Sequence, residues 1–108
     1  MFLLSLSAAA IFMTQASQPV RMETRTLPDG VEVLVVGSSE TPVGASYKLE
    51  VASGTNRSSQ SGNVQLRPGK AVTLVRQRLG GSMAADWTAR LQVDLQDGQS
   101  YSDLRSSR

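Results

Sequence analysis

The sequence predicts an all-β domain, a seven-stranded antiparallel β-sandwich of the immunoglobulin-like type, with a small β-barrel as the alternative. Three observations support this fold class. Apolar and polar residues alternate with a period of two in several segments, turn residues recur roughly every 8–15 positions, and no segment shows the periodicity of an amphipathic helix. The chain has 108 residues, a length that suits one domain.

The N-terminus has the features of an export signal. Residues 2–13 form an uncharged apolar run that is too short for a membrane span, which needs about 20 residues, but suits the core of a signal peptide. Residues 14–16 (TQA) then place small residues where a signal peptidase cleaves. We therefore expect a secretory signal peptide at residues 1–16 and one immunoglobulin-like domain at residues 17–108. An N-terminal core strand or helix is the alternative, since no Lys or Arg precedes the apolar run.

The first three strands are predicted from alternation. Residues 20–26 alternate with charged positions, which is typical of a half-buried strand, and LPDG at residues 27–30 predicts a turn. Residues 31–36 form a second strand rich in β-branched residues, whose valines at alternate positions share one face. A loop at residues 37–42 leads to the third strand. That strand places an apolar set opposite a charged set: Tyr47, Leu49 and Val51 against Lys48 and Glu50.

The middle of the chain is predicted to contain a long loop. Residues 54–62 (GTNRSSQSG) are polar and rich in turn-forming residues, so we expect an exposed loop there. A short strand follows, with Val64 and Leu66 facing inward, and it ends at the Pro68-Gly69 turn signal.

The strand predicted at residues 71–79 has an ambiguous second half. Val72 and Leu74 are expected to face inward at its start, but Arg76 and Arg78 fall in the same phase. Because charged side chains are costly to bury in a core, we expect a β-bulge or an edge position in this strand.

The last hairpin carries the strongest strand signal. Residues 87–95 alternate strictly, and Trp87 is predicted to be the central packing residue of the core. Asp97-Gly98 predicts a tight turn, and a final strand continues through Tyr101. We attribute Asp97 to this turn and Asp94 to a solvent-facing strand position rather than to catalysis or calcium binding.

The composition excludes much catalytic chemistry. The chain contains neither cysteine nor histidine, so the usual zinc, haem and iron–sulfur ligands are missing. Ser-His-Asp catalysis, Cys-His catalysis and thiol redox chemistry are excluded for the same reason. What remains is a binding module, or an enzyme built from carboxylates, Lys and hydroxyls alone. Because the spacing of the carboxylates offers no clustered catalytic pair, we expect a protein that is not an enzyme and that has no cofactor and no metal site.

Positive charge is concentrated in the middle of the chain. No Asp or Glu occurs between Val51 and Ala85, and that segment has a formal charge of +5, against +2 for the whole chain. A sandwich folds this segment into adjacent strands and loops, so its cations could share one side and attract an acidic partner. The alternative is ordinary solvated faces, with Arg at an edge strand to prevent unwanted strand pairing. The five cations are Arg57, Arg67, Lys70, Arg76 and Arg78.

Two stretches of the chain resemble a known family. Residues 53–79 (SGTNRSSQSGNVQLRPGKAVTLVRQRL), followed by residues 90–101 (RLQVDLQDGQSY), are similar to the curli assembly chaperones of the CsgC type. The shared elements are a short export signal, a Ser/Gly/Gln stretch before a strand, the LRPGKAVTL pattern at residues 66–74, and VDLQDGQS at residues 93–100. The resemblance covers roughly residues 20–104 and contains no catalytic signature.

The resemblance implies a periplasmic immunoglobulin-like sandwich that keeps curli subunits from forming amyloid before export. Some members of the family carry two cysteines separated by one residue, in the segment that corresponds to Gly44-Ala45-Ser46 here. This sequence has no cysteine, which speaks against a thiol-based activity. It resembles instead the cysteine-free CsgH branch, which inhibits amyloid formation without a thiol.

On this basis we expect a periplasmic chaperone that inhibits premature amyloid polymerisation of curli subunits through transient, electrostatically guided binding. The expected partner is a disordered curli subunit, the amyloid client, and the protein itself is expected to be a monomer. No nucleic acid is expected, because the basic segment lacks aromatic residues for base stacking, and no membrane insertion is expected after signal cleavage.

The expected client-binding site is electrostatic. Arg76 and Arg78, on an edge strand, are expected to lead the contact with the client, because a basic face increases the rate of encounter with an acidic chain. The supporting cations are Lys48, Arg67, Lys70 and Arg90. The alternative function is a generic exported immunoglobulin-like adhesion or structural binding module without amyloid-inhibiting activity.

Overall fold

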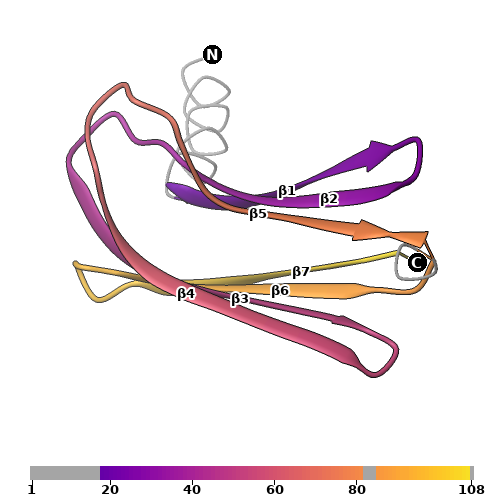
Figure 1. Cartoon of the computed structure of the whole chain (residues 1–108). Helices are drawn as coiled ribbons and strands as arrows, with labels where there is room; N and C mark the ends of the chain where they lie inside the picture. Colours follow the sequence, from indigo (N-terminus) through magenta and orange to yellow (C-terminus); the bar gives the residue numbers. More distant parts are fainter. Residues whose placement is uncertain (1–17, 82–84, 108) are drawn as a thin grey trace, which may run out of the picture.

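In the structure, a computed structural model that describes residues 18–81 and 85–107, seven strands form two antiparallel sheets (Figure 1). One sheet has the strand order β1-β2-β5 and the other has the order β4-β3-β6-β7. The strands are β1 (Val20–Leu27), β2 (Gly30–Gly37), β3 (Val43–Ser53), β4 (Asn56–Leu66), β5 (Val72–Gly80), β6 (Thr88–Leu95) and β7 (Ser100–Ser106).

The two sheets pack face to face and do not close into a barrel, so the predicted seven-stranded sandwich is confirmed (Figure 1). In a constant-type immunoglobulin domain the fourth strand joins the sheet of the first, second and fifth strands. Here β4 instead pairs with β3 in the other sheet. As a result β4 and β5, which are consecutive in the chain, are edge strands of different sheets.

The core consists of the inner-face residues of both sheets. Val33, Val35, Leu49 and Leu91 are at most 1% exposed, and Trp87 belongs to the same buried cluster, as the sequence predicts. Each fully buried residue of this size contributes about 1.5–3 kcal/mol through burial of apolar surface. The chain has no cysteine and therefore no disulfide. Burial of the core holds the two sheets against each other, and backbone hydrogen bonds join the strands within each sheet.

Two hairpin turns lie where the sequence predicts them. Leu27 pairs with Gly30 around the first turn, between β1 and β2. In the second turn, between β6 and β7, the Gln99 N–H donates to the Asp97 Oδ1 at 2.9 Å. Gly98 has a φ of +95°, a left-handed conformation that favours glycine over any residue with a Cβ.

The expected loop at residues 54–62 is wrong, because most of this stretch is a strand. β4 begins at Asn56 and pairs with β3 in unbroken register until Leu66, which lies opposite Val43. Only Gly54 and Thr55 remain as a turn. The stretch lacks apolar alternation because most side chains of β4 are exposed, so hydrogen bonding to the β3 backbone stabilises it more than side-chain burial does.

β5 contains the β-bulge that its charge pattern predicts, and it is also an edge strand. Val75 lies opposite Val35, but the register shifts at the next pair, so Leu74 is an extra residue in β5. The bulge reverses the phase of the side chains. Val75 is therefore buried, whereas Arg76 and Arg78 point away from the core.

Val72, which was predicted to face inward, lies opposite an inner-face position but is not buried, because it is 41% exposed at the end of the sheet. Val72 pairs with Gly37 at the start of β5. The side chains of Leu66 and Leu74 fill the space next to Gly37 where a side chain would otherwise lie. These two leucines complete the core at this end, which leaves Val72 in contact with solvent.

A tyrosine connects the two sheets on the side of β1 and β7. β7 extends beyond its predicted length, to Ser106, and Tyr101 near its start is half-buried. The Tyr101 hydroxyl donates a hydrogen bond to the Val20 carbonyl at 2.7 Å and accepts one from the Val20 N–H at 3.0 Å. One side chain thus binds both backbone groups of a fully buried residue of β1.

The expected signal peptide at residues 1–16 lies outside the described residues, and so does the expected first residue of the mature domain, Ser17. Within residues 18–81 and 85–107, no helix has the length and apolar character needed to cross a membrane.

Replacing Tyr101 by Phe should lower the free energy of unfolding by about 1–3 kcal/mol, because two hydrogen bonds are lost and the backbone of Val20 stays buried. Chemical denaturation in urea measures this cost. Tyr47→Phe is the matched control, since no hydrogen bond of the Tyr47 hydroxyl is found in the described part of the chain. Equal costs for the two substitutions would contradict the role of Tyr101.

The stability of the wild-type protein should also fall at alkaline pH. Burial raises the pKa of Tyr101 above its ordinary value of 10.0, although the hydrogen bond with Val20 and the charge of Arg21 act in the opposite direction. A raised pKa in the folded state means that stability is fully present below pH 10 and is lost as the pH rises through the folded-state pKa. Urea unfolding from neutral pH to above pH 10 should show this decline, and Tyr101→Phe should weaken it.

Candidate functional site

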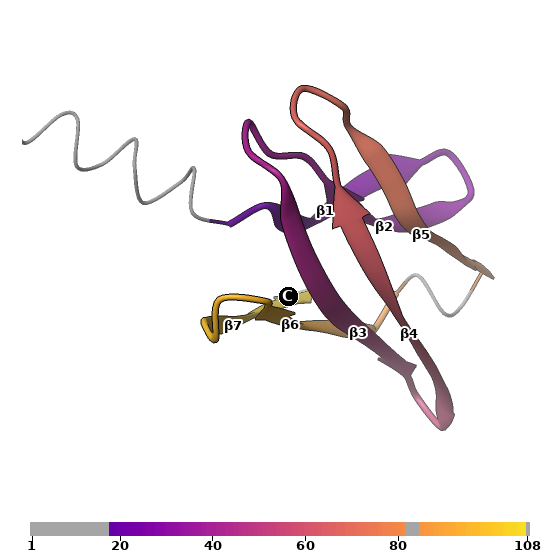
Figure 2. The ribbon, with the colours of Figure 1, turned by 90° about the vertical axis from the view of Figure 1, so that its left-hand side faces the viewer.

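The basic segment lies along one side of the sandwich. β4 and β5 are the edge strands on this side, and residues 67–71 connect them by crossing from one sheet to the other (Figure 2). From Asn56 to Gly80 the chain contains no Asp or Glu. All five cations of the segment therefore lie on β4, on β5 or in the loop between them, which together we call the basic side.

The side chain of Gln77 joins the two edge strands of the basic side. From β5, its Nε2 donates to the Ser58 Oγ at 2.7 Å, and its Oε1 accepts from the Gln60 Nε2 at 3.1 Å. Ser58 and Gln60 both belong to β4. The sheets are thus linked here by polar side chains, and Arg57 and Arg78 line the same small pocket beside this link.

Arg76 and Arg78 share a carboxylate on the outer face of the three-stranded sheet. Glu32 lies on β2, between Arg25 on β1 and Arg78 on β5 in the strand register. Its carboxylate oxygens lie 3.6 Å from the guanidinium of Arg25, 3.8 Å from that of Arg76 and 3.9 Å from that of Arg78. The Glu32 side chain is only 7% exposed, whereas the three arginine side chains are more than 60% exposed.

This cluster remains positively charged, because three guanidinium groups surround one carboxylate. The exposed guanidinium groups remain accessible to a second anion. Neither Arg25 nor Glu32 is among the site residues that the sequence predicts. The available signal was Glu32 itself, a charged residue that interrupts a run of valines in a strand. Its neighbours on the adjacent strands, however, can be assigned only once the strand register is known.

The structure does not bring the six expected site residues together on one face. Arg76 and Arg78 lie on the outer face of the three-stranded sheet, whereas Lys48 and Arg90 lie on the outer face of the four-stranded sheet. Lys48 also forms an ion pair with Glu50 at 3.9 Å. Arg67 and Lys70 are exposed in the loop between β4 and β5.

Several exposed cations have no ion-pair partner within 4.0 Å in the described part of the chain. No carboxylate of the described residues lies within ion-pair distance of these cations, whereas Arg76 and Arg78 are partly compensated by Glu32. Three of them belong to the basic side and one lies on the outer face of β6. They are Arg57, Arg67, Lys70 and Arg90.

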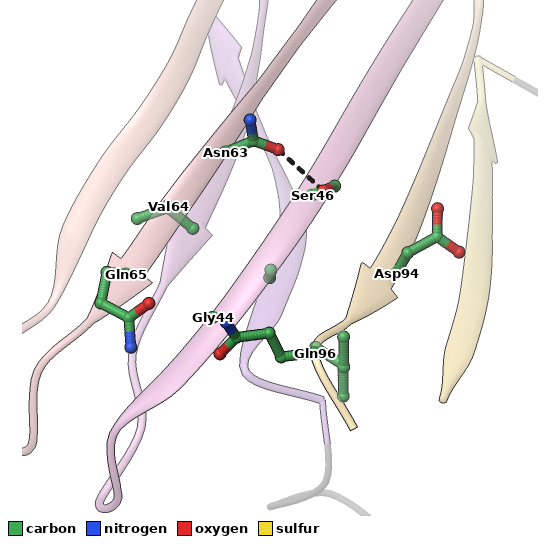
Figure 3. Close-up of a pocket in the computed structure, with 9 residues that line it drawn as sticks. Gly44, Ser46, Asn63, Val64, Gln65, Asp94 and Gln96 are labelled. Carbon is green, nitrogen blue, oxygen red and sulfur yellow. Dashed lines mark hydrogen bonds between the residues drawn. The ribbon is translucent and has the colours of Figure 1, made fainter. Parts of the chain in front are cut away.

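Part of the outer face of the four-stranded sheet carries amide and hydroxyl groups, as the close-up of a pocket there shows (Figure 3). The Ser46 hydroxyl donates to the Asn63 Oδ1 at 2.7 Å. Gln65 and Gln96 lie on either side of Gly44 (Figure 3), and their side-chain oxygens occupy the space that a Cβ at this position would need. A glycine here therefore lets two amide side chains close over the sheet.

The described residues of this surface offer hydrogen-bonding groups and cations. Among them, no group of three or more Asp or Glu side chains is placed to hold a metal ion. The Asp94 carboxylate is exposed on β6 beside the amide-lined pocket, and that of Asp97 is engaged in its turn. Exposed cations and amide and hydroxyl groups of this kind can bind anionic and hydrogen-bonding groups.

Comparison with known proteins identifies a similar fold. No model of a protein family matches the chain, and no curated protein matches it. The solution structure of CsgH from R. palustris is similar, with a TM-score of 0.61 and 23% sequence identity over 82% of this chain and 90% of that chain. This similarity shows that the two proteins share a fold.

Replacing Glu32 by Gln should lower the free energy of unfolding by about 1–3 kcal/mol, because three arginines lose their shared counter-charge. Urea unfolding measures the loss. Glu50→Gln is the control, since it removes one exposed ion pair, with Lys48, and should cost less than about 1 kcal/mol. If the two substitutions cost the same, the Glu32 cluster does not stabilise the sheet.

Proposed function

We propose that this protein is a periplasmic chaperone, without enzymatic activity, that inhibits premature amyloid polymerisation of curli subunits. Two kinds of similarity support the proposal. Residues 53–79 and 90–101 resemble the CsgC-type curli assembly chaperones in sequence, and the fold is similar to that of CsgH from R. palustris. The chain resembles the cysteine-free branch of that family, so the proposed activity uses no thiol.

The observation that carries the proposal is the basic side. A stretch of 25 residues from Asn56 to Gly80 contains five cations and no acidic residue, and the fold arranges it as two neighbouring edge strands and their connection. The three unpaired cations of this side would attract an acidic chain over a distance of about one Debye length, roughly 10 Å at 0.1 M salt.

Electrostatic attraction suits the proposed task because the client need not be held for long. Chains rich in Gln, Asn and Gly polymerise when exposed strands stack in register. A chaperone that meets early oligomers quickly and releases them again can delay this step at a low molar ratio. Electrostatic steering raises the association rate by about 10 to 1,000-fold over unsteered encounters at low salt.

In a polymerisation assay with a purified curli subunit, followed by thioflavin fluorescence, substoichiometric protein should lengthen the lag phase. Raising the salt concentration should shorten the lag towards its value without the protein, because salt screens exposed charges. A buffer-only series over the same salt range corrects for the client's own salt dependence. An unchanged lag at low salt would contradict the proposed function and leave a generic exported adhesion or structural module.

In the double variant Arg76→Gln with Arg78→Gln, inhibition should be about tenfold weaker at low salt, so about ten times more protein should be needed for the same lag extension. The reason is that the variant removes two positive charges from the basic side. The variant should fold, since Glu32 keeps its ion pair with Arg25. Reversal to Glu is a poorer test, because two new carboxylates beside Glu32 would destabilise the sheet.

The matched control for this variant is Arg21→Gln with Arg105→Gln. It removes the same charge from the opposite side of the sandwich, where both residues line a pocket between β1 and β7. Inhibition should be close to that of the wild type in this control. Equal losses in the two double variants would show that net charge alone matters and would reject the assignment of Arg76 and Arg78.

A further inference from the structure

The edge of β4 lacks the features that protect edge strands from pairing with other chains. Such features include Pro, bulges, several charged residues and short length. β4 has 11 residues, no Pro, one charged residue and an unbroken register with β3. Strands rich in Ser, Gly and amide residues also specify their register weakly, so they accept alternative partners more easily.

The other sheet edges of the described structure each carry such a feature. β1 has charged residues at alternate positions, and the Tyr101 hydroxyl occupies both backbone groups of Val20. β5 has its bulge and two arginines that lie against Glu32. β7 carries Asp103 and Arg105 as an ion pair at 3.4 Å.

The backbone groups that β4 presents to solvent follow from its pairing with β3. In an antiparallel pair, residues that bond the partner strand alternate with residues whose N–H and C=O point away from it. The two-residue turn at Gly54 and Thr55 makes its flanking pair, Ser53 and Asn56, a hydrogen-bonded pair. The groups directed towards the open edge therefore belong to Arg57, Ser59, Ser61, Asn63 and Gln65.

A hydrogen bond at the other end of the sheet supports the same alternation. The Gln96 N–H donates to the Gly44 carbonyl at 2.9 Å, so Gly44 bonds towards β6 and not towards β4. Its partner in β4 is Gln65, whose backbone groups consequently face outward. No strand of the described structure lies against this edge.

We propose that the open edge of β4 binds an extended, acidic, Gln- and Asn-rich segment of the client as an additional strand of the four-stranded sheet. This inference rests on the function proposed above and names the part of the surface that holds the client. Backbone hydrogen bonds supply the affinity in such strand addition, and the neighbouring side chains select the sequence.

Charge and side-chain chemistry favour this occupant. The open edge lies on the basic side, with Arg57 on β4 itself and the β4–β5 loop cations at the other end of the strand. The outer-face side chains of β4 between these ends are small hydroxyls and amides, which can form ladders with the amides of a neighbouring strand. Acidic residues in the bound segment would contact the cations at either end.

Strand addition at β4 also explains how few molecules could delay many clients. A growing fibre needs a free strand edge at its tip, onto which the next subunit adds. When β4 pairs with that tip, its other edge is already bound to β3, so the sheet continues into a folded domain and not into another client. Each bound molecule would stop one growing end.

The variant Ser61→Pro tests the proposal, because proline removes the N–H that faces the open edge and leaves the bonds to β3 in place. About ten times more of this variant should be needed for the same lag extension in the curli-subunit assay. The matched control is Ser102→Pro, the same change at the edge-facing position of β7, as its pairing with Gln92 indicates. The control should inhibit like the wild type.

Circular dichroism and thermal melting establish that both variants are folded. If Ser61→Pro inhibits as well as Ser102→Pro while the wild type inhibits normally, the edge proposal is wrong and the proposed function stands. If the wild type itself has no effect on the lag, the proposed function fails and the edge is judged by the exchange measurement alone.

Amide hydrogen exchange of the wild-type protein, measured by NMR, gives a second test that needs no variant. The probe is a disordered, acidic, Gln- and Asn-rich synthetic peptide. Its addition should slow exchange at Ser59, Ser61 and Asn63, whereas Ser102 on β7 should be unaffected. Equal slowing on both edges, or none, would overturn the proposal. If exchange at these β4 amides is already slow without peptide and becomes slower as the protein concentration rises, a second copy of this chain occupies the edge. That result would also overturn the proposal.

Discussion

Burial of the inner faces of the two sheets is the interaction on which this structure depends. With no disulfide available, the domain is held by a core of valines, leucines, Met22 and Trp87, and by the backbone ladders. Since side chains alternate along a strand, each inward position must be apolar or small, and each charge must point outward. The bulge in β5 shows how strict this requirement is, because an extra residue there is what keeps Arg76 and Arg78 out of the core.

Much of the fold could be predicted from the sequence because the signals that define it are local. Alternation within a few residues defines β1, β2 and β6, and the turn chemistry of Pro28-Asp29 and Asp97-Gly98 defines two of the hairpins. The conflict between Leu74 and Arg76 was enough to predict an irregularity in β5. These features depend on neighbours in the chain and need no knowledge of the partner strand.

The features that the sequence did not reveal depend on contacts between distant residues. β4 carries no apolar alternation, because its pairing with β3 relies on backbone groups that every residue possesses. The cations were expected on one side, and five of them do lie on β4, on β5 or in the loop between these strands. Which outer face each one occupies, however, depends on the bulge and on the sheet that β4 joins. The Glu32 cluster likewise exists only in the register that places Arg25 and Arg78 on either side of it.

The Glu32 carboxylate, which three arginines share, affects how these arginines can pair with an anionic group of another molecule. Because three guanidinium groups compensate Glu32, each of them can turn away while the other two still balance the buried charge. When one arginine leaves Glu32 to pair with a carboxylate of another chain, the buried Glu32 charge therefore stays compensated. The arginine can return to Glu32 in the same way. Under the proposed function, such interchangeable pairing would favour both fast capture and fast release.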